Sequence, residues 1–195
     1  MPTTYDVKLI GKREVAENTM EFRLEKPAGL NIRAGQFCDI VLPLPKGTPK
    51  EATTHGFSFV NAPYENYVAV ATRMRNSPFK NAARGLEIGS MLQIIAAWGD
   101  FTLQKDEAIP AVFVIGGIGI TPVFSILKQA WHDKTKHKLT LIYANRTRAQ
   151  AAYSDELEQI ARDNVNFTFV RAYTQAQDDP TAAPIFLNES REPWL

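Results

Sequence analysis

The sequence predicts an antiparallel β-barrel followed by a partial parallel α/β domain. The first half contains several short extended runs separated by Gly, Pro and Asn turns, which is typical of a small antiparallel barrel. From residue 111 onward, apolar strands alternate with amphipathic helices, and this pattern predicts βαβ crossovers and a parallel sheet. A polar, charged segment at 104–110 indicates a linker. We therefore expect a barrel domain at 1–106 and an α/β domain at 107–195.

In the barrel half, the alternation of apolar and polar residues with a period of two predicts the strands. Apolar side chains alternate with polar or charged ones in two runs: Tyr5, Val7 and Leu9, then Met20, Phe22 and Leu24. Further extended runs occupy 36–42, 67–73 and 91–95. One short helix is expected, with Ser77 as its N-cap and Pro78 as its first residue. Its inner face would consist of Phe79, Ala82, Ala83 and Leu86.

In the second half, strands are expected at 111–115, 139–143 and 167–173. Helices are expected at about 122–132 and 148–163. Thr121 is predicted to cap the first of these helices, and Pro122 suits its first turn. Thr147 and Gln150 have the spacing of a capping box for the second helix. The buried stripe of that helix would consist of Tyr153, Leu157, Ile160 and Ala161.

Composition excludes several kinds of site. The net charge of +1 gives no electrostatic case for a nucleic-acid partner. Cys38 is the only cysteine, which excludes an intrachain disulfide, a cysteine zinc site and a four-cysteine iron–sulfur cluster. The three histidines are scattered along the chain, so we expect no metal site. A reducing cytoplasm fits this cysteine usage best.

Hydropathy indicates no export signal and no membrane span. Residues 1–12 lack the apolar core of a signal peptide. Residues 108–127 carry no charge and are long enough to cross a bilayer. However, they contain two prolines and three glycines that divide them into a strand, a loop and a helix. We therefore expect a cytoplasmic protein without a membrane span.

A glycine-rich turn follows the first strand of the α/β half. Gly116, Gly117 and Gly119 lie between that strand and the next helix. Such a turn lets a pyrophosphate approach backbone N–H groups at the positive end of a helix dipole. The spacing differs from the G-x-G-x-x-G fingerprint, and a tight turn in any α/β domain would use the same residues. The turn alone therefore leaves both interpretations open.

A series of motifs in register decides between them. Besides the glycine turn, it comprises Ala34-Gly35-Gln36-Phe37, Thr54-His55-Gly56-Phe57-Ser58-Phe59, Ser77-Pro78-Phe79-Lys80, Gly99-Asp100-Phe101 and Tyr143-Ala144-Asn145-Arg146-Thr147. In this order the chain resembles the ferredoxin–NADP reductase superfamily of flavoprotein oxidoreductases, from about residue 5 to residue 174. The resemblance implies an FAD-binding barrel and an NAD(P)-binding α/β domain.

The resemblance also implies where the flavin lies. Phe57 would pack against the isoalloxazine and Ser58 would hydrogen-bond near its N5 atom, with Gly56 between His55 and Phe57. His55 stands where the family usually has an Arg for the flavin phosphate, and its alternative role is an exposed turn histidine. Ser77, Pro78, Phe79 and Lys80 would hold the flavin phosphates, although an ordinary capped helix would use the same residues. Ala71, Thr72 and Arg73 lie on a strand that carries flavin contacts in the family.

For the nicotinamide coenzyme, the resemblance assigns the pyrophosphate to Gly116, Gly117 and Gly119. Thr121 would lie at the nicotinamide and the flavin edge, which makes Phe57, Ser58 and Thr121 the catalytic candidates. Asn145 and Arg146 are further cofactor candidates, because an arginine at the position of Arg146 can meet a 2′-phosphate. Gln175 stands about where NADP-preferring members have a second arginine, so NADH and NADPH both remain open.

One departure from the family concerns the C-terminus. The family's nucleotide domain continues to a Cys-Gly-Pro-like turn that faces the nicotinamide, and this sequence stops before such a turn. Either the sequence is truncated, or the protein keeps the flavin site with a reduced nucleotide domain. In both cases we expect this chain's α/β domain to lack its usual C-terminal portion and flavin reduction to be slow.

The expected function is hydride transfer from NADH or NADPH to FAD, followed by electron transfer to a separate acceptor. A ferredoxin, a flavodoxin or an oxygenase component would suit as that acceptor. The alternatives are a non-catalytic flavin- or nucleotide-binding subunit of a redox complex, and an interaction domain that has lost its ligands.

Overall fold

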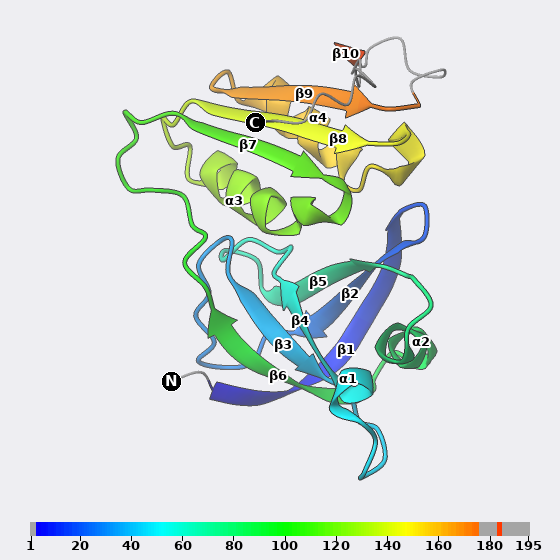
Figure 1. Cartoon of the computed structure of the whole chain (residues 1–195). Coiled ribbons are helices and arrows are strands. Elements are labelled where there is room, and N and C mark those ends of the chain that lie inside the picture. Colours follow the sequence, from blue (N-terminus) through cyan, green and yellow to red (C-terminus); the bar gives the residue numbers. More distant parts are fainter. Residues whose placement is uncertain (1–2, 176–182, 185–195) are drawn as a thin grey trace, which may run out of the picture.

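A computed structural model describes residues 3–175 and 183–184 of the chain. Its first part is a six-stranded antiparallel sheet in the order β4-β3-β6-β1-β2-β5, which curls into a barrel-like shape (Figure 1). The strands are β1 (Thr3–Ala16), β2 (Thr19–Glu25), β3 (Phe37–Val41), β4 (Thr54–Ser58), β5 (Tyr67–Arg73) and β6 (Met91–Trp98). Two short helices, α1 (Lys50–Thr53) and α2 (Pro78–Gly85), lie beside it. We call this the barrel part.

The barrel part is not closed by a continuous ladder. Strands β4 and β5 are the two edges of the sheet. Just beyond β4 they are joined by an isolated bridge between Phe59 and Val70 and by a hydrogen bond from Val60 N to Ala69 O (2.8 Å). The rest of the two edges therefore forms an open seam, with unpaired backbone groups available to a ligand.

The second part is a parallel sheet in the order β10-β9-β8-β7, which we call the α/β part. Its strands are β7 (Ala111–Gly116), β8 (Leu139–Asn145), β9 (Phe167–Tyr173) and β10 (Ala183–Pro184). Its helices are η1 (Gly117–Gly119), α3 (Ile120–His132), η2 (Arg148–Gln150) and α4 (Ser154–Asp163). The two parts confirm the predicted fold class. The domain boundary at residue 106 falls in the connection between β6 and β7 and remains a proposal.

Helices α3 and α4 pack on one face of the parallel sheet. Side chains of β7, β8 and β9 that point to this face, such as Phe113, Leu141 and Phe167, form one core with both helices. On the opposite face, Val112 and Val114 are 63% and 72% exposed. Among the described residues, that face therefore has no helix over β7.

The predicted elements are present, but three local predictions are wrong. Thr121 does not cap α3, because the N-cap is Gly119 and the Thr121 hydroxyl donates to Ile118 O (3.2 Å). The capping box is absent, since the Thr147 side chain makes no cap bond. The predicted helix 148–163 is divided into η2 and α4 by Tyr153, whose φ of 62° is left-handed. Helix α1 had no sequence signal that we recognised.

The two parts share a core. Val60, Ala69 and Ala71 of the barrel part pack with buried residues of α3 and of the parallel sheet. At this contact the Ser125 hydroxyl of α3 donates to Asn61 O (2.6 Å) in a buried position. Helix α3 therefore lies between the parallel sheet and the barrel part, as Figure 1 shows.

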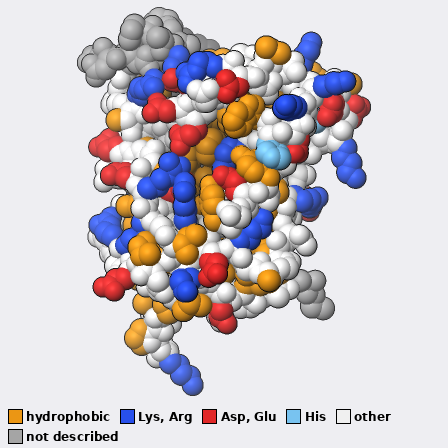
Figure 2. Space-filling model, turned by 180° about the vertical axis from the view of Figure 1, so that it is seen from behind, with side chains coloured by type: hydrophobic (Ala, Val, Ile, Leu, Met, Phe, Trp, Pro, Cys, Tyr) orange, Lys and Arg blue, Asp and Glu red, His pale blue; other side chains and the backbone are white. Residues whose placement is uncertain are grey.

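On the face shown in Figure 2, acidic and basic side chains are interspersed around a strip of hydrophobic ones that crosses the middle of the molecule.

No helix within the described ranges is long and apolar enough to cross a membrane. Those same ranges contain no group of three His, Cys, Asp or Glu side chains that could hold a metal ion.

Candidate functional site

The residues assigned to the isoalloxazine lie along the β4 edge. The rings of His55 and Phe57 stack with centroids 4.8 Å apart. Phe79 of α2 lies 5.5 Å from each of them and is buried. Ser58 points to the other side of the strand, because successive side chains of a strand alternate between its two faces; its register partner on β3 is Phe37. The structure therefore brings His55, Phe57 and Phe79 together as one aromatic cluster at the seam.

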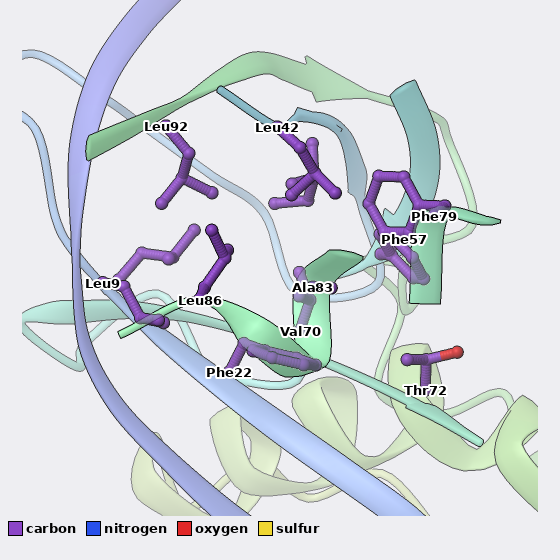
Figure 3. A pocket seen from close by; sticks show the side chains of 12 residues that line it. Leu9, Phe22, Leu42, Phe57, Val70, Thr72, Phe79, Ala83, Leu86 and Leu92 are labelled. Atoms are coloured by element: carbon purple, nitrogen blue, oxygen red, sulfur yellow. The ribbon is translucent and has the colours of Figure 1, made fainter. Parts of the chain in front are cut away.

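Beneath this cluster lies an apolar cavity in the barrel part. Phe57, Thr72 and Phe79 line it together with aliphatic side chains such as Leu9, and Figure 3 shows these side chains around it. Its volume is about 20 Å³, which is room for about one water molecule. An isoalloxazine does not fit inside the barrel part. The exposed seam outside it, where His55 and Gly56 reach solvent, is the place for a ring of that size.

The turn before α2 has the predicted capped geometry. Ser77 Oγ accepts a hydrogen bond from Lys80 N at 3.4 Å, and Pro78 occupies the first helical position. The Lys80 ammonium donates to Arg73 O (2.8 Å) at the end of β5. The backbone N–H and the ammonium of Lys80, which were both predicted to face the flavin phosphates, therefore donate to acceptors within the protein. The Lys80 ammonium still has two further N–H groups, and burial lowers its pKa.

The glycine turn at the end of β7 requires glycine at one position. Gly117 has a φ of +53°, which is in the left-handed region. Its carbonyl accepts a hydrogen bond from Tyr143 Oη of β8 (3.0 Å). No atom outside the immediate backbone comes within 4 Å of the Cβ position of Gly116. The Tyr143 hydroxyl thus fixes the turn at Gly117, while the space beside Gly116 is open to a ligand.

Arg73 joins the two parts at this turn. Its Nη2 atom lies 3.7 Å from the Cβ position of Gly117 and donates to Gln150 O (3.3 Å). Its Nε–H is buried without a hydrogen-bond partner among the described residues, and the same is true of the Asn145 amide at the end of β8. Buried polar groups normally have partners, so these groups indicate a place for a polar ligand.

Arg146 and Gln175 are neighbours at the carboxyl edge of the parallel sheet. Gln175 N donates to Arg146 O (2.8 Å), and Thr174 N donates to Asn145 O (3.0 Å). Arg146 is exposed, and within the described ranges its side chain has no hydrogen bond or ion pair. The two positions that the sequence analysis linked to coenzyme choice therefore lie side by side.

Comparisons with known proteins agree with this arrangement. A family model described as an oxidoreductase NAD-binding domain matches residues 113–191. Ferredoxin–NADP reductase B of Sorangium cellulosum is 28% identical over 162 residues, which are 81% of this chain and 65% of that protein. The chain is thus similar to ferredoxin–NADP reductases over most of its length. The resemblance stated from the motifs is thereby confirmed.

Other relatives match a similar share of the chain. The reductase component of propane 2-monooxygenase from Rhodococcus jostii is 24% identical over 84% of this chain and 44% of its own length. The fold matches a ferredoxin NADP⁺ reductase from Neisseria gonorrhoeae with a TM-score of 0.78 and 21% identity, over 92% of this chain and 71% of that one. The chain thus spans from 44% to 65% of the length of these two curated relatives.

Three residues at or beside this candidate site were not found from the sequence. Tyr143 supports Gly117, and Gln150 accepts the hydrogen bond of Arg73. Glu21 was read as one of the polar positions of an alternating strand, but it is 2% exposed. Only Tyr143 carried a signal, because it opens the motif that includes Asn145 and Arg146. The other two depend on how the parts pack together.

Proposed function

We propose that this chain is an FAD-dependent NAD(P)H oxidoreductase module that passes electrons to a separate acceptor. The observation that carries the proposal is Arg73, which extends from the seam of the barrel part to the glycine turn of the α/β part. A cation at this place joins the surface suited to a flavin with the surface suited to a dinucleotide. The finer site assignments below belong to the same proposal.

For FAD, the seam supplies an aromatic surface and polar groups. Phe57 would pack against the ring system and Ser58 would lie beside its edge, while the turn at Ser77–Lys80 would face the phosphates. When bound, flavin would supply the acceptance of a hydride from the nicotinamide, the transfer of its two electrons onward one at a time, and the release of its proton to solvent. The contribution of the chain is to bind, align and exclude water.

For NADH or NADPH, the glycine turn and Arg73 would hold the pyrophosphate. The first N–H groups of α3 have no acceptor within the helix, and the helix dipole favours an anion there. Thr121 would lie near the nicotinamide by its backbone position, since its hydroxyl is bonded to Ile118 O. Arg146 would meet the 2′-phosphate of NADPH.

The acceptor would be a ferredoxin, a flavodoxin or an oxygenase component. Relatives of the chain include reductase components of propane 2-monooxygenase and phenol 2-monooxygenase, which supports the last of these. We also place the protein in the cytoplasm as part of the proposal, on the basis of its single, buried cysteine.

An anaerobic titration tests the proposal directly. The purified chain is expected to retain FAD, and NADH or NADPH is expected to bleach the flavin absorbance. A colourless protein that takes up no added FAD would contradict the flavin site. A yellow protein that neither coenzyme bleaches would identify a binding subunit rather than an oxidoreductase.

Coenzyme choice is expected to depend on Arg146. Hydrogen bonds to a charged group are worth about 1.5–3 kcal/mol each, so Arg146→Ala is expected to weaken NADPH binding about tenfold or more. Binding of NADH is expected to change less than twofold. The measurement is the dissociation constant of each coenzyme in its oxidised form. Arg162→Ala on α4 serves as the control, because Arg162 is exposed and its Nη2 donates to Gln159 on the same helix. Equal losses for both coenzymes would assign Arg146 to loop support instead.

A further inference from the structure

A buried carboxylate lies where the two parts meet. Glu21 of β2 is 2% exposed and accepts hydrogen bonds from two arginines of the barrel part. Arg13 approaches it with Nε at 2.9 Å and Nη2 at 3.2 Å, and Arg23 approaches with Nε at 2.7 Å. Burial alone would raise the pKa of Glu21, but these hydrogen bonds outweigh it and lower the pKa below its ordinary value. Glu21 is therefore a carboxylate at neutral pH.

The fourth contact to Glu21 crosses to the α/β part. Tyr153 Oη donates to Glu21 Oε2 at 3.0 Å in a buried position. The Tyr153 ring stacks on Phe124 of α3, with centroids 4.4 Å apart and 15° between the planes. Tyr153 thus connects a carboxylate of the barrel part to the helix that follows the glycine turn.

The backbone of Tyr153 is strained. Its φ of 62° is left-handed, which costs a residue with a Cβ free energy relative to a right-handed conformation. Such a conformation persists only when its surroundings hold it. The hydroxyl contact with Glu21 and the stacking on Phe124 are the surroundings that hold Tyr153.

Tyr153 is the last residue of segment 150–153, and this segment contacts Arg73. Gln150, whose carbonyl accepts the Arg73 hydrogen bond, precedes Tyr153 by three positions. On the barrel side, Glu21 is paired in register with Ala71, two residues before Arg73 on β5. The Glu21–Tyr153 hydrogen bond therefore joins the two stretches of chain that contain Arg73 and Gln150. Gln150 has a further contact with the barrel part, because its side-chain amide donates to Glu17 Oε2 (3.1 Å).

We propose that Glu21 and Tyr153 are positioning residues for the coenzyme: their contact fixes segment 150–153, and through Gln150 it orients Arg73 toward the glycine turn. This inference rests on the proposed function, because it assigns Arg73 to the phosphates of NAD(P)H. Neither Glu21 nor Tyr153 would touch the coenzyme itself.

The test is calorimetric titration of the folded, flavin-loaded chain with NADP⁺ and with NAD⁺. Tyr153→Phe keeps the ring and removes only the hydroxyl. This variant is expected to raise the dissociation constants of NADP⁺ and NAD⁺ about tenfold. That change corresponds to the loss of one hydrogen bond between Arg73 and the coenzyme phosphates. Glu21→Gln is expected to do the same, so the test does not depend on one variant folding. A melting curve of each variant confirms that it is folded.

Tyr67→Phe is the matched control. Tyr67 also donates its hydroxyl to a partly buried carboxylate, that of Glu65, but both residues belong to the barrel part. Its loss is expected to lower the melting temperature while leaving coenzyme affinity within twofold. Equal effects of Tyr67→Phe and Tyr153→Phe on affinity would overturn the inference, because a general loss of stability would then explain both.

The Arg73→Met background separates this inference from the proposed function. In that background, Tyr153→Phe is expected to have no further effect on affinity, since the side chain that it orients is gone. An additional tenfold loss there would overturn the positioning role. If Arg73→Met alone leaves affinity unchanged, the assignment of Arg73 in the proposed function fails, whatever Tyr153→Phe does.

Discussion

Replacing Arg73 with Met is expected to weaken binding of both NADP⁺ and NAD⁺ by roughly ten- to a hundredfold. Charge-assisted hydrogen bonds to a phosphate are worth about 1.5–3 kcal/mol each, and the Arg73 guanidinium is 3.7 Å from the Cβ position of Gly117 in the glycine turn. Methionine keeps much of the apolar stem that packs at the junction. The measurement is calorimetric titration of the flavin-loaded variant with each oxidised coenzyme.

Retention of FAD separates a local effect of Arg73→Met from damage to the barrel part. Flavin content is expected to stay close to that of the unaltered chain. Arg162→Met on α4 is the control for a lost surface cation and is expected to leave coenzyme binding unchanged, since Arg162 is exposed. If Arg73→Met releases the flavin and leaves coenzyme affinity intact, Arg73 belongs to the flavin site, as the resemblance alone implied.

Substitution of Gly35 by Ala is expected to destabilise the chain by about 3–5 kcal/mol, a loss of the size seen only for severe substitutions. Gly35 has a φ of +95°, and a Cβ atom there would lie 1.9 Å from Phe101 O and 3.0 Å from Ile126 Cδ1. The first of these atoms is backbone, so the chain after β6 would have to shift. Because Ile126 belongs to α3, the shift would also disturb the contact between the two parts. Chemical denaturation measures the loss.

Gly29 provides the matched control. It also has a left-handed backbone, with a φ of +79°, but no atom outside its own segment lies within 4 Å of its Cβ position. Gly29→Ala is therefore expected to cost only the conformational strain, about 1–2 kcal/mol. Equal losses at the two positions would mean that the approach of Gly35 to Phe101 is not what requires glycine there.

Local chemistry was enough to predict most elements of this chain, although not α1 or β4. The alternation of Met20, Phe22 and Leu24 predicted β2, and Ser77 with Pro78 predicted the start of α2; both are confirmed. These features depend on residues close together in sequence, whose periodicity and capping are visible without a tertiary structure. The order of the motifs was likewise sufficient to recognise the superfamily.

The two predicted helix caps failed for different reasons. Thr121 has the residue type of an N-cap, but the turn formed by Gly117–Gly119 lets helix α3 begin at Ile120, two residues before the predicted start at Pro122. Gln150 has the spacing for a capping box, but its side chain donates to Glu17 of the barrel part (3.1 Å). Only the second failure involves a contact that the local sequence does not contain, namely that of Gln150 with Glu17.

The sequence by itself determined the two-part architecture, the glycine turn and the residue types along the seam, because each is a property of local pattern. Only the tertiary structure decided the position of Arg73 between the two parts and the burial of Glu21. Strand alternation says which side of β2 Glu21 faces, but not that Tyr153 and helix α3 of the other part lie near that side. A buried carboxylate and a junction-spanning arginine arise only when two surfaces meet. No pattern within either segment encodes that contact.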